Sequence, residues 1–333
     1  MKIIIDAMGG DNAPKDIIRA SVKAVDELGI EIVLVGEEVV VKSELQKYNV
    51  KNISKITIHN AEEVISNDDA PVMAIKSKKD SSMVVGLNLL KDGHGDAFVS
   101  AGNTGALMTG ALLIVKRIEG VDRPALAPII PTEQGPAVLI DGGSNVDCKP
   151  INLLQFAVMG SIYAKKALNI DNPRVGLVNI GSEEKKGNEL TKESYELLKN
   201  KGNLNFVGNI EGREVPEGKA DVIVCDGFVG NVILKVMEGM GLAINNFLKQ
   251  EFSKNIITKL GAFIAKSAFM GLKKKMDYKE YGGAILVGVN GAIIKAHGSA
   301  DDTIFFNTIK KTRNIVESGL VGKIREEIAK IGE

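Results

Sequence analysis

Short apolar runs alternate with amphipathic stretches along most of the chain. The runs predict β-strands at residues 2–6, 31–36, 54–59, 96–100, 173–178, 203–208 and 220–225. Helices are predicted at residues 14–28, 39–47, 105–117, 151–168 and 188–200, where apolar residues recur three and four positions apart. This alternation is typical of parallel strands joined by right-handed crossovers, with helices on both faces. We therefore expect an α/β fold, a three-layer α/β/α sandwich with a mostly parallel, Rossmann-like sheet.

Two regions depart from this alternation. Residues 125–130 and 136–140 are strand-like and are separated by residues 132–135, which predicts a β-hairpin added to the sheet. Residues 232–277 predict a helical hairpin with a break near Ser253. We expect one large α/β domain over residues 1–333, with the helical hairpin as a subdomain at about 232–277.

The two helices of this hairpin differ in their surfaces. The first is apolar on more than one face, and packing in the protein core is the ordinary role for such a helix. On the second, Leu260 and Ile264 belong to an apolar face, whereas Lys259, Lys266 and Lys273 recur every seven residues along another. A basic amphipathic helix of this kind is typical of contact with an anionic membrane or an acidic protein. A dimer interface, a channel for an apolar chain and a solvated basic face are alternatives that the pattern leaves open.

The bulk composition excludes several classes of protein. The 333 residues are 44% hydrophobic and 25% charged, as in an ordinary soluble globular protein. Lys and Arg together number 42, as do Asp and Glu, so no net charge favours nucleic acid as a partner. Cys148 and Cys225 lack the spacing of a disulfide framework or a zinc site. No apolar run has the length of a signal peptide or a membrane span, and we expect a cytoplasmic protein.

The sequence lacks the usual nucleotide fingerprints. No predicted strand is followed by G-x-G-x-x-G, and G-x-x-x-x-G-K-[ST] does not occur. The sequence therefore predicts neither NAD nor ATP as a cofactor.

Polar segments that contain glycine follow several of the predicted strands. They lie at residues 6–11, 100–106, 141–147, 179–187 and 226–231. Because the carboxyl ends of parallel strands meet at the same edge of a sheet, we expect one cleft that approaches a ligand with its backbone. The second segment has the pattern of a strand, a tight turn and a helix N-terminus, where unpaired backbone N–H groups bind an anion such as phosphate. An ordinary turn capped by Thr104 is the alternative.

Motifs in these segments resemble those of the PlsX family of phosphate acyltransferases, over nearly the whole chain. They include Asp6-Ala7-Met8-Gly9-Gly10-Asp11, Ser100-Ala101-Gly102-Asn103-Thr104-Gly105-Ala106, Arg123-Pro124-Ala125-Leu126, Asn179-Ile180-Gly181 with Lys186-Gly187, Cys225-Asp226-Gly227-Phe228-Val229-Gly230-Asn231, and Tyr281-Gly282-Gly283-Ala284 with His297-Gly298-Ser299. Residues 69–76 and 81–83 are similar to the family as well. The sequence departs from the pattern at Ser144, where alanine is expected, and at Glu214, where aspartate is expected.

The resemblance implies an acyltransferase reaction. Long-chain acyl-ACP, a thioester of acyl carrier protein, reacts with inorganic phosphate to give acyl phosphate and ACP at the entry to phospholipid synthesis. The resemblance also implies a homodimer, a fold like that of phosphotransacetylases and isopropylmalate dehydrogenase, and no metal or organic cofactor. Delivery of a long-chain product favours a cytoplasmic protein that is peripheral on the inner face of the cell membrane.

Acyl transfer to phosphate requires an oriented, desolvated phosphate and a stabilised oxyanion at the thioester carbonyl. The predicted catalytic residues are Lys186, Asp226, Asn231 and His297. The predicted phosphate- or substrate-binding residues are Asp6, Gly9, Gly10, Asp11, Ser100, Asn103, Thr104, Asp141, Asn145, Gly187 and Ser299. Ordinary roles are the alternatives for three of the catalytic candidates: a solvated loop lysine for Lys186, a helix cap for Asp226 and a structural histidine for His297. His59 and His94 have no predicted role.

A covalent acyl-enzyme would require an activated thiol. Cys225 ends an apolar strand and has no histidine adjacent in sequence, so we expect it in the core and predict direct attack by phosphate. Two other functions stay open: a phosphotransacetylase-like enzyme that uses acyl-CoA, and a noncatalytic regulator that binds phosphate or an acyl chain. The polar strand ends argue against the regulator, because an acyl-binding module needs only an apolar pocket.

Overall fold

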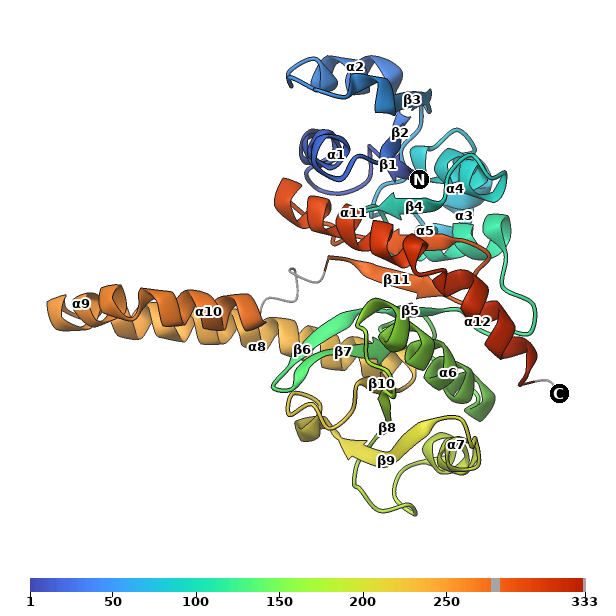
Figure 1. The fold of residues 1–333 in the computed structure, drawn as a ribbon, viewed down its shortest axis with the longest axis vertical. Helices are drawn as coiled ribbons and strands as arrows, with labels where there is room; N and C mark the ends of the chain where they lie inside the picture. The colour runs from blue at the N-terminus through green and yellow to red at the C-terminus, as the bar shows by residue number, and fades with distance from the viewer. Residues whose placement is uncertain (277–281, 332–333) are drawn as a thin grey trace.

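The strands form two sheets, both flanked by helices (Figure 1). The computed structural model describes residues 1–276 and 282–331, without the side chains of 272–276. The seven-stranded sheet has the order β3-β2-β1-β4-β12-β11-β5, with strands Ile56–Asn60, Glu31–Gly36, Lys2–Asp6, Ala97–Ser100, Ala292–Lys295, Ala284–Val287 and Ala125–Ala127. The five-stranded sheet has the order β6-β7-β10-β8-β9, with strands Ile129–Thr132, Gly135–Ile140, Val222–Val224, Arg174–Asn179 and Asn205–Glu211. The expected α/β class is confirmed, and most strand pairs are parallel.

Helices cover both faces of the seven-stranded sheet. Helices α1 (Lys15–Leu28) and α11 (Asp302–Glu317) pack on one face, and α4 (Ser82–Lys91) with α5 (Thr104–Gly110) packs on the other. β1 reaches both sides because alternate side chains of a strand point to opposite faces. Its Ile3 and Ile5 lie in the core under α1, whereas Ile4 lies in the core under α4.

The remaining helices complete the layers. They are α2 (Glu38–Leu45), α3 (Pro71–Ser77), α6 (Pro150–Ala167), α7 (Glu189–Lys199) and α12 (Leu320–Ala329), with a π-helical turn at Ala111–Val115 and 3₁₀ turns at Ile53–Lys55 and Gly212–Glu214. α6 and α7 pack on one face of the five-stranded sheet, and the first turns of α8 (Gly227–Ser253) pack on the other.

One chain segment passes from the first sheet into the second. β5 pairs with β11, and β6 pairs antiparallel with β7. Pro128 lies between β5 and β6, and proline cannot continue a strand ladder as a donor. The expected hairpin is therefore confirmed for β6 and β7, but residues 125–127 belong to the other sheet.

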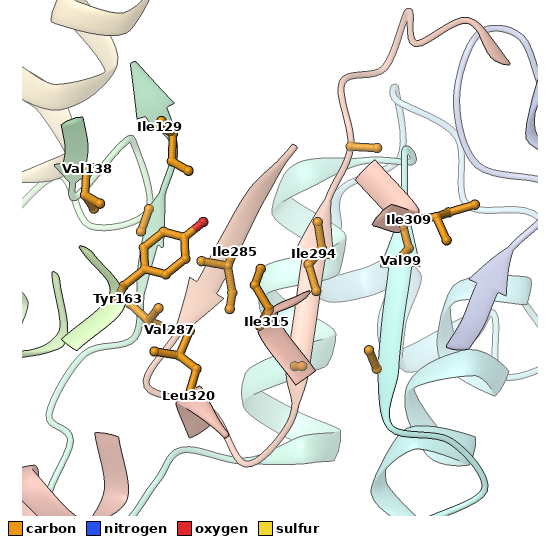
Figure 2. Close-up of a cluster of buried hydrophobic side chains, with 14 of the residues drawn as sticks. Val99, Ile129, Val138, Tyr163, Ile285, Val287, Ile294, Ile309, Ile315 and Leu320 are labelled. Carbon is orange, nitrogen blue, oxygen red and sulfur yellow. The ribbon is translucent and has the colours of Figure 1, made fainter. Parts of the chain in front are cut away.

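The largest buried cluster takes side chains from both sheets (Figure 2). Val99 and Ile294 come from the seven-stranded sheet, and Val138 comes from the five-stranded sheet. Tyr163 of α6 lies between them in the same cluster. Continuous packing of this kind supports the expectation of one large domain, which stays a prediction.

Helices α8, α9 (Ile256–Ile264) and α10 (Lys266–Met276) form an arm that extends away from the two sheets (Figure 1). The predicted break near Ser253 is confirmed, and the second helix divides again at Ala265. Core packing for the first helix is wrong beyond its first turns, because only Gly227 and Gly230 of α8 are buried. In the described part of the chain, α8 is the one helix long and apolar enough to cross a membrane, a criterion that some core helices also meet.

Candidate active site

Asp6 organises the carboxyl-terminal edge of the seven-stranded sheet. It is buried at the end of β1, and its carboxylate accepts hydrogen bonds from Ser82 Oγ and Ser100 Oγ, both at 2.7 Å. The backbone N–H groups of Met8 and Gly9 also donate to it. Burial raises the pKa of Asp6, and these hydrogen bonds act in the opposite direction. The Asp6 side chain therefore fixes the loop after β1 against the turn after β4.

Ser100 and Asn103 shape the predicted anion-binding turn with their side chains. The Ser100 hydroxyl donates to Asp6 and accepts from the Gly102 N–H at 3.0 Å. Asn103 caps α5 by accepting from the Ala106 N–H at 2.9 Å, and its amide donates to the carbonyl of Ser66 at 3.1 Å. The cap is thus Asn103, and the alternative of a cap at Thr104 is wrong. Thr104 is exposed at the first position of α5.

The loops after β1, β4 and β12 meet at this edge. Asp11 N–H donates to the carbonyl of Gly298 at 2.8 Å. Gly10 has a φ of 108°, and a Cβ there would lie 2.8 Å from the Cβ of Ala101, so only glycine permits this approach. His297 Nδ1 lies 2.9 Å from the Ser299 hydroxyl and 3.2 Å from the Ser299 backbone nitrogen. The structure therefore brings Gly9, Gly10, Asp11, His297 and Ser299 together around the turn.

Asp141 organises the corresponding edge of the five-stranded sheet. It is fully buried after β7, and its carboxylate accepts from the backbone N–H groups of Gly143, Ser144 and Asn145 at 2.6–3.1 Å. The Leu126 N–H donates to the same carboxylate at 3.1 Å and to the Ser144 hydroxyl at 2.9 Å. The serine that departs from the family pattern thus makes a bond that alanine could not make. Burial raises the pKa of Asp141, and the N–H donors oppose that rise.

The N-terminus of α8 docks on this loop. Asp226 caps α8 by accepting from the Val229 N–H at 2.9 Å. The Gly227 N–H donates to the carbonyl of Asn145 at 2.7 Å, and the Asn145 amide donates to Asp141 at 2.9 Å. Asn231 is exposed in the next turn, and a Cβ built on Gly143 would lie 3.3 Å from its Cβ. Asp141, Asn145, Asp226 and Asn231 are therefore one structural unit.

Lys186 and Gly187 lie in the loop after β8, which ends at this same edge because β8 is parallel to β10. The buried Asn179 amide donates to the carbonyl of Lys186 at 3.0 Å and so folds the loop back over the strand end. The Lys186 side chain is exposed. Among the described residues, no three His, Cys, Asp or Glu side chains are grouped so as to hold a metal ion.

The two edges are linked by α8 and by β5. Leu126, in β5 of the seven-stranded sheet, donates its N–H to Asp141 of the other edge. Lys235 of α8 lies near enough to Lys295, the last residue of β12, for its charge to help lower the pKa of Lys295. The predicted segments thus form two clusters on two sheets, and α8 begins at the cluster around Asp141.

The two cysteines are poorly suited to nucleophilic catalysis. Cys225 is buried in the core as expected, and burial with the nearby charge of Asp226 raises the pKa of its thiol well above the usual value. Burial also raises the pKa of Cys148 to about 12. A thiolate is the reactive form, so both groups are inert at neutral pH.

The fold and the strand-end clusters define an α/β protein of the phosphotransacetylase fold. A phosphotransacetylase from Streptococcus pyogenes superposes with a TM-score of 0.61 at 18% identity, covering 95% of this chain and 94% of that one. The EutD phosphotransacetylase from Staphylococcus aureus gives a TM-score of 0.60 at 16% identity, covering 96% of this chain and 94% of that one. At this level of identity the likeness establishes the fold alone.

Comparison with whole sequences identifies the family. The model of a family described as fatty acid synthesis protein matches residues 1–323. A phosphate acyltransferase from Thermoanaerobacterium thermosaccharolyticum is 55% identical over 333 residues, which cover 100% of this chain and 98% of the relative. One from Alkaliphilus oremlandii is 51% identical over 333 residues, covering 100% of this chain and 99% of the relative. The chain therefore belongs to the PlsX family of phosphate acyltransferases.

Proposed function

We propose that this phosphate acyltransferase takes a long-chain acyl group from acyl-ACP and transfers it to inorganic phosphate, in phospholipid synthesis. Family membership over the whole chain carries the proposal, and it is supported by strand-end clusters on two sheets that α8 connects. A phosphotransacetylase-like use of acyl-CoA is the alternative donor, and it draws on the fold shared with phosphotransacetylases. A noncatalytic regulator has no comparable support.

The proposed step is direct attack of phosphate on the thioester. A phosphate oxygen bonds to the carbonyl carbon, the C–S bond breaks, and its electron pair leaves with the sulfur as the ACP thiolate. Backbone N–H groups of the turn after β4 hold the phosphate, with Gly9, Gly10 and Asp11 at its side. Lys186 and Asn231 stabilise the oxyanion by donating hydrogen bonds. Asp226 orients the N-terminus of α8. His297 and Ser299 are the remaining residues beside the phosphate.

A phosphate-dependent thiol assay tests this proposal. Purified protein is incubated with palmitoyl-ACP and inorganic phosphate, and free ACP thiol and acyl phosphate are both measured. We expect stoichiometric formation of both products, and much slower turnover with acetyl-CoA. Faster turnover with acetyl-CoA would favour the alternative donor, and no phosphate-dependent thiol release from either donor would favour the regulator.

Substitution of the buried cysteine separates direct attack from an acyl-enzyme. We expect Cys225→Ser to keep its turnover within a few-fold of the wild type, because the buried thiol has a raised pKa and is not a nucleophile. Far-UV circular dichroism and the KM for acyl-ACP serve as controls for folding and binding. Loss of turnover in a folded variant that still binds substrate would contradict direct attack.

We propose that the tip of the arm contacts the membrane to deliver the acyl phosphate, which places the protein peripherally on the inner face of the cell membrane. Leu260 is 59% exposed and Ile264 is 74% exposed, although both are large apolar side chains. Lys259 and Lys266 are exposed on the same arm. Lys273, the third predicted lysine, has a side chain outside the described ones, and Tyr281 of the family motifs lies outside the described residues. The basic charge suits an anionic surface and also acidic ACP.

Leu260→Glu is expected to reduce binding to vesicles that contain phosphatidylglycerol. A buried leucine contributes about 1.5–3 kcal/mol, so partitioning should fall at least about 10-fold. Flotation of the protein with vesicles measures the bound fraction. Val39→Glu is the matched control, because Val39 is 75% exposed on α2, far from the arm. Equal flotation of wild type and Leu260→Glu would contradict membrane contact through α9.

We also propose that the protein is a homodimer that pairs through α8. Val232, Val236 and Met240 recur every four residues along this helix and are 47–58% exposed. An apolar stripe of this kind on a free helix is commonly covered by a partner. Sedimentation equilibrium of the wild type would detect the dimer, and a monomer at micromolar concentration would contradict it.

A further inference from the structure

Lys295 is a charged residue of the strand-end edge that the sequence analysis did not select. It is the last residue of β12, directly opposite Ser100 of β4 in the parallel register. Its ammonium donates to the carbonyl of Ala101 at 3.2 Å and to the carbonyl of Ala296. The ammonium therefore lies directly beside the turn after β4, where Ala101 also approaches Gly10.

The charge of Lys295 is incompletely balanced. Burial of the ammonium lowers the pKa of Lys295 to about 8, while Asp6 and Asp11 act to raise it. Among the residues that the structure describes, no carboxylate forms an ion pair with it; Asp6 is engaged by Ser82 and Ser100 instead. A partly buried cation without a carboxylate partner is costly, and an anion bound beside it would offset part of that cost.

A second cation near Lys295 belongs to α8. Lys235 of α8 disfavours the charged form of Lys295, so the two ammonium groups lie close enough to repel each other. Lys235 is paired with Glu238 at 2.8 Å, whereas Lys295 has carbonyl acceptors only. An ammonium has three N–H donors, and two of those of Lys295 are used, which leaves one for a ligand. An anion beside Lys295 would weaken the repulsion between the two ammonium groups and would accept the remaining N–H of Lys295.

We propose that Lys295 contacts the reacting phosphate directly and holds it beside the turn after β4 by charge and by its remaining N–H donor. This inference rests on the proposed function, because it names a ligand of the phosphate in that reaction. Lys295 then belongs to the phosphate side of the site, with the turn after β4. In this proposal other residues bind the acyl donor, so substitution of Lys295 changes the KM for phosphate and not the KM for the acyl donor.

Lys311 provides a matched control. Among the described residues it is the other lysine whose pKa is lowered mainly by burial, to about 7, and its ammonium donates to the carbonyl of Gly283 at 2.9 Å. It lies in α11, with its ammonium 5.9 Å from the centre of the Tyr163 ring, and its acceptor Gly283 directly precedes β11, whose Ala284 lies opposite Lys295. Its chemistry is thus similar to that of Lys295, but its carbonyl acceptor belongs to the segment before β11 and not to the turn after β4.

The test compares Lys295→Met with Lys311→Met. We expect Lys295→Met to raise the KM for phosphate by about 10- to 100-fold, the loss of one hydrogen bond to a charged group, with the KM for acyl-ACP unchanged. Lys311→Met should lower the thermal midpoint without changing the KM for phosphate. Inorganic phosphate should raise the thermal midpoint of the wild type and of Lys311→Met, but not of Lys295→Met. Lys295→Arg keeps the charge and should recover part of the affinity.

Each outcome decides the inference. An unchanged KM for phosphate in Lys295→Met, with a fall in thermal midpoint like that of Lys311→Met, would overturn it. If Lys295→Met does not fold, Lys295→Gln is measured in the same way. Should the wild type form no acyl phosphate, phosphate-dependent thermal stabilisation that requires Lys295 would still support the contact, and the proposed function alone would fail. If phosphate raised the thermal midpoint equally in all variants, the inference about Lys295 would be wrong and the proposed function would stand.

Discussion

Replacing Asp141 with alanine is expected to lower the free energy of unfolding by about 3–5 kcal/mol and turnover at least about 100-fold. The Asp141 carboxylate is fully buried and accepts hydrogen bonds from the N–H groups of Leu126, Gly143, Ser144 and Asn145. Its removal leaves buried donors without an acceptor and releases the loop on which α8 docks. Urea unfolding measures the first effect, and the phosphate-dependent thiol assay measures the second.

Asp221→Ala is the matched control for this variant. Asp221 lies at the opposite edge of the same sheet, where it pairs with Arg174 at 2.8 Å and accepts from the Arg174 N–H at 2.8 Å. Its loss should cost stability but should leave turnover per folded molecule unchanged. If Asp141→Ala kept wild-type turnover, the loop after β7 would not position the site.

Adding a single methyl group at Gly230 is expected to disrupt the junction between α8 and the Asp141 loop. A Cβ at Gly230 would lie 1.9 Å from the carbonyl oxygen of Asp141, a backbone atom that cannot rotate away. Gly230→Ala therefore has to displace α8, which should cost about 3 kcal/mol or more, at the upper end of overpacking. Turnover should fall with it, because Asp226 and Asn231 move with the helix.

Gly239→Ala tests the same change in the same helix without the contact. A Cβ at Gly239 would meet no atom within 4 Å. Alanine there should stabilise α8 by about 0.5–1 kcal/mol, the usual difference from glycine in a helix interior. Equal midpoints and equal turnover for Gly230→Ala and Gly239→Ala would contradict the close docking of α8.

Local sequence patterns predicted most of the elements well. β1, β2 and α1 begin and end within a residue of their predicted bounds, since alternating strands and helices carry strong periodicity. The strand pair β11 and β12 was missed, although both are interior strands of the seven-stranded sheet. Its strands follow the arm and are joined to each other by a short turn, outside the alternation of strands and helices that predicted the others. Lys295 was missed with them.

The sequence predicted which residues belong to the candidate site, but not how their side chains are arranged. Ser100 and Asn103 were selected as phosphate ligands, and the structure uses both side chains within the protein to build the turn. Their type and spacing are the same in either role, so only their partners distinguish them. Those partners, Asp6 and Ser66, are far from Ser100 and Asn103 in the chain.

The sequence by itself determined the α/β class, the polar strand ends and the family, because local periodicity and short motifs are properties of neighbouring residues. Only the tertiary structure decided that the strands form two sheets, that α8 leaves the core as an arm, and that Lys295 lies beside the turn after β4. The physical reason is that each of these depends on contacts between distant segments. A proline such as Pro128 interrupts a strand ladder wherever it occurs, and a glycine such as Gly230 allows close approach of any backbone segment. The packing of the whole chain decides which strand ends at Pro128 and which backbone segment lies against Gly230.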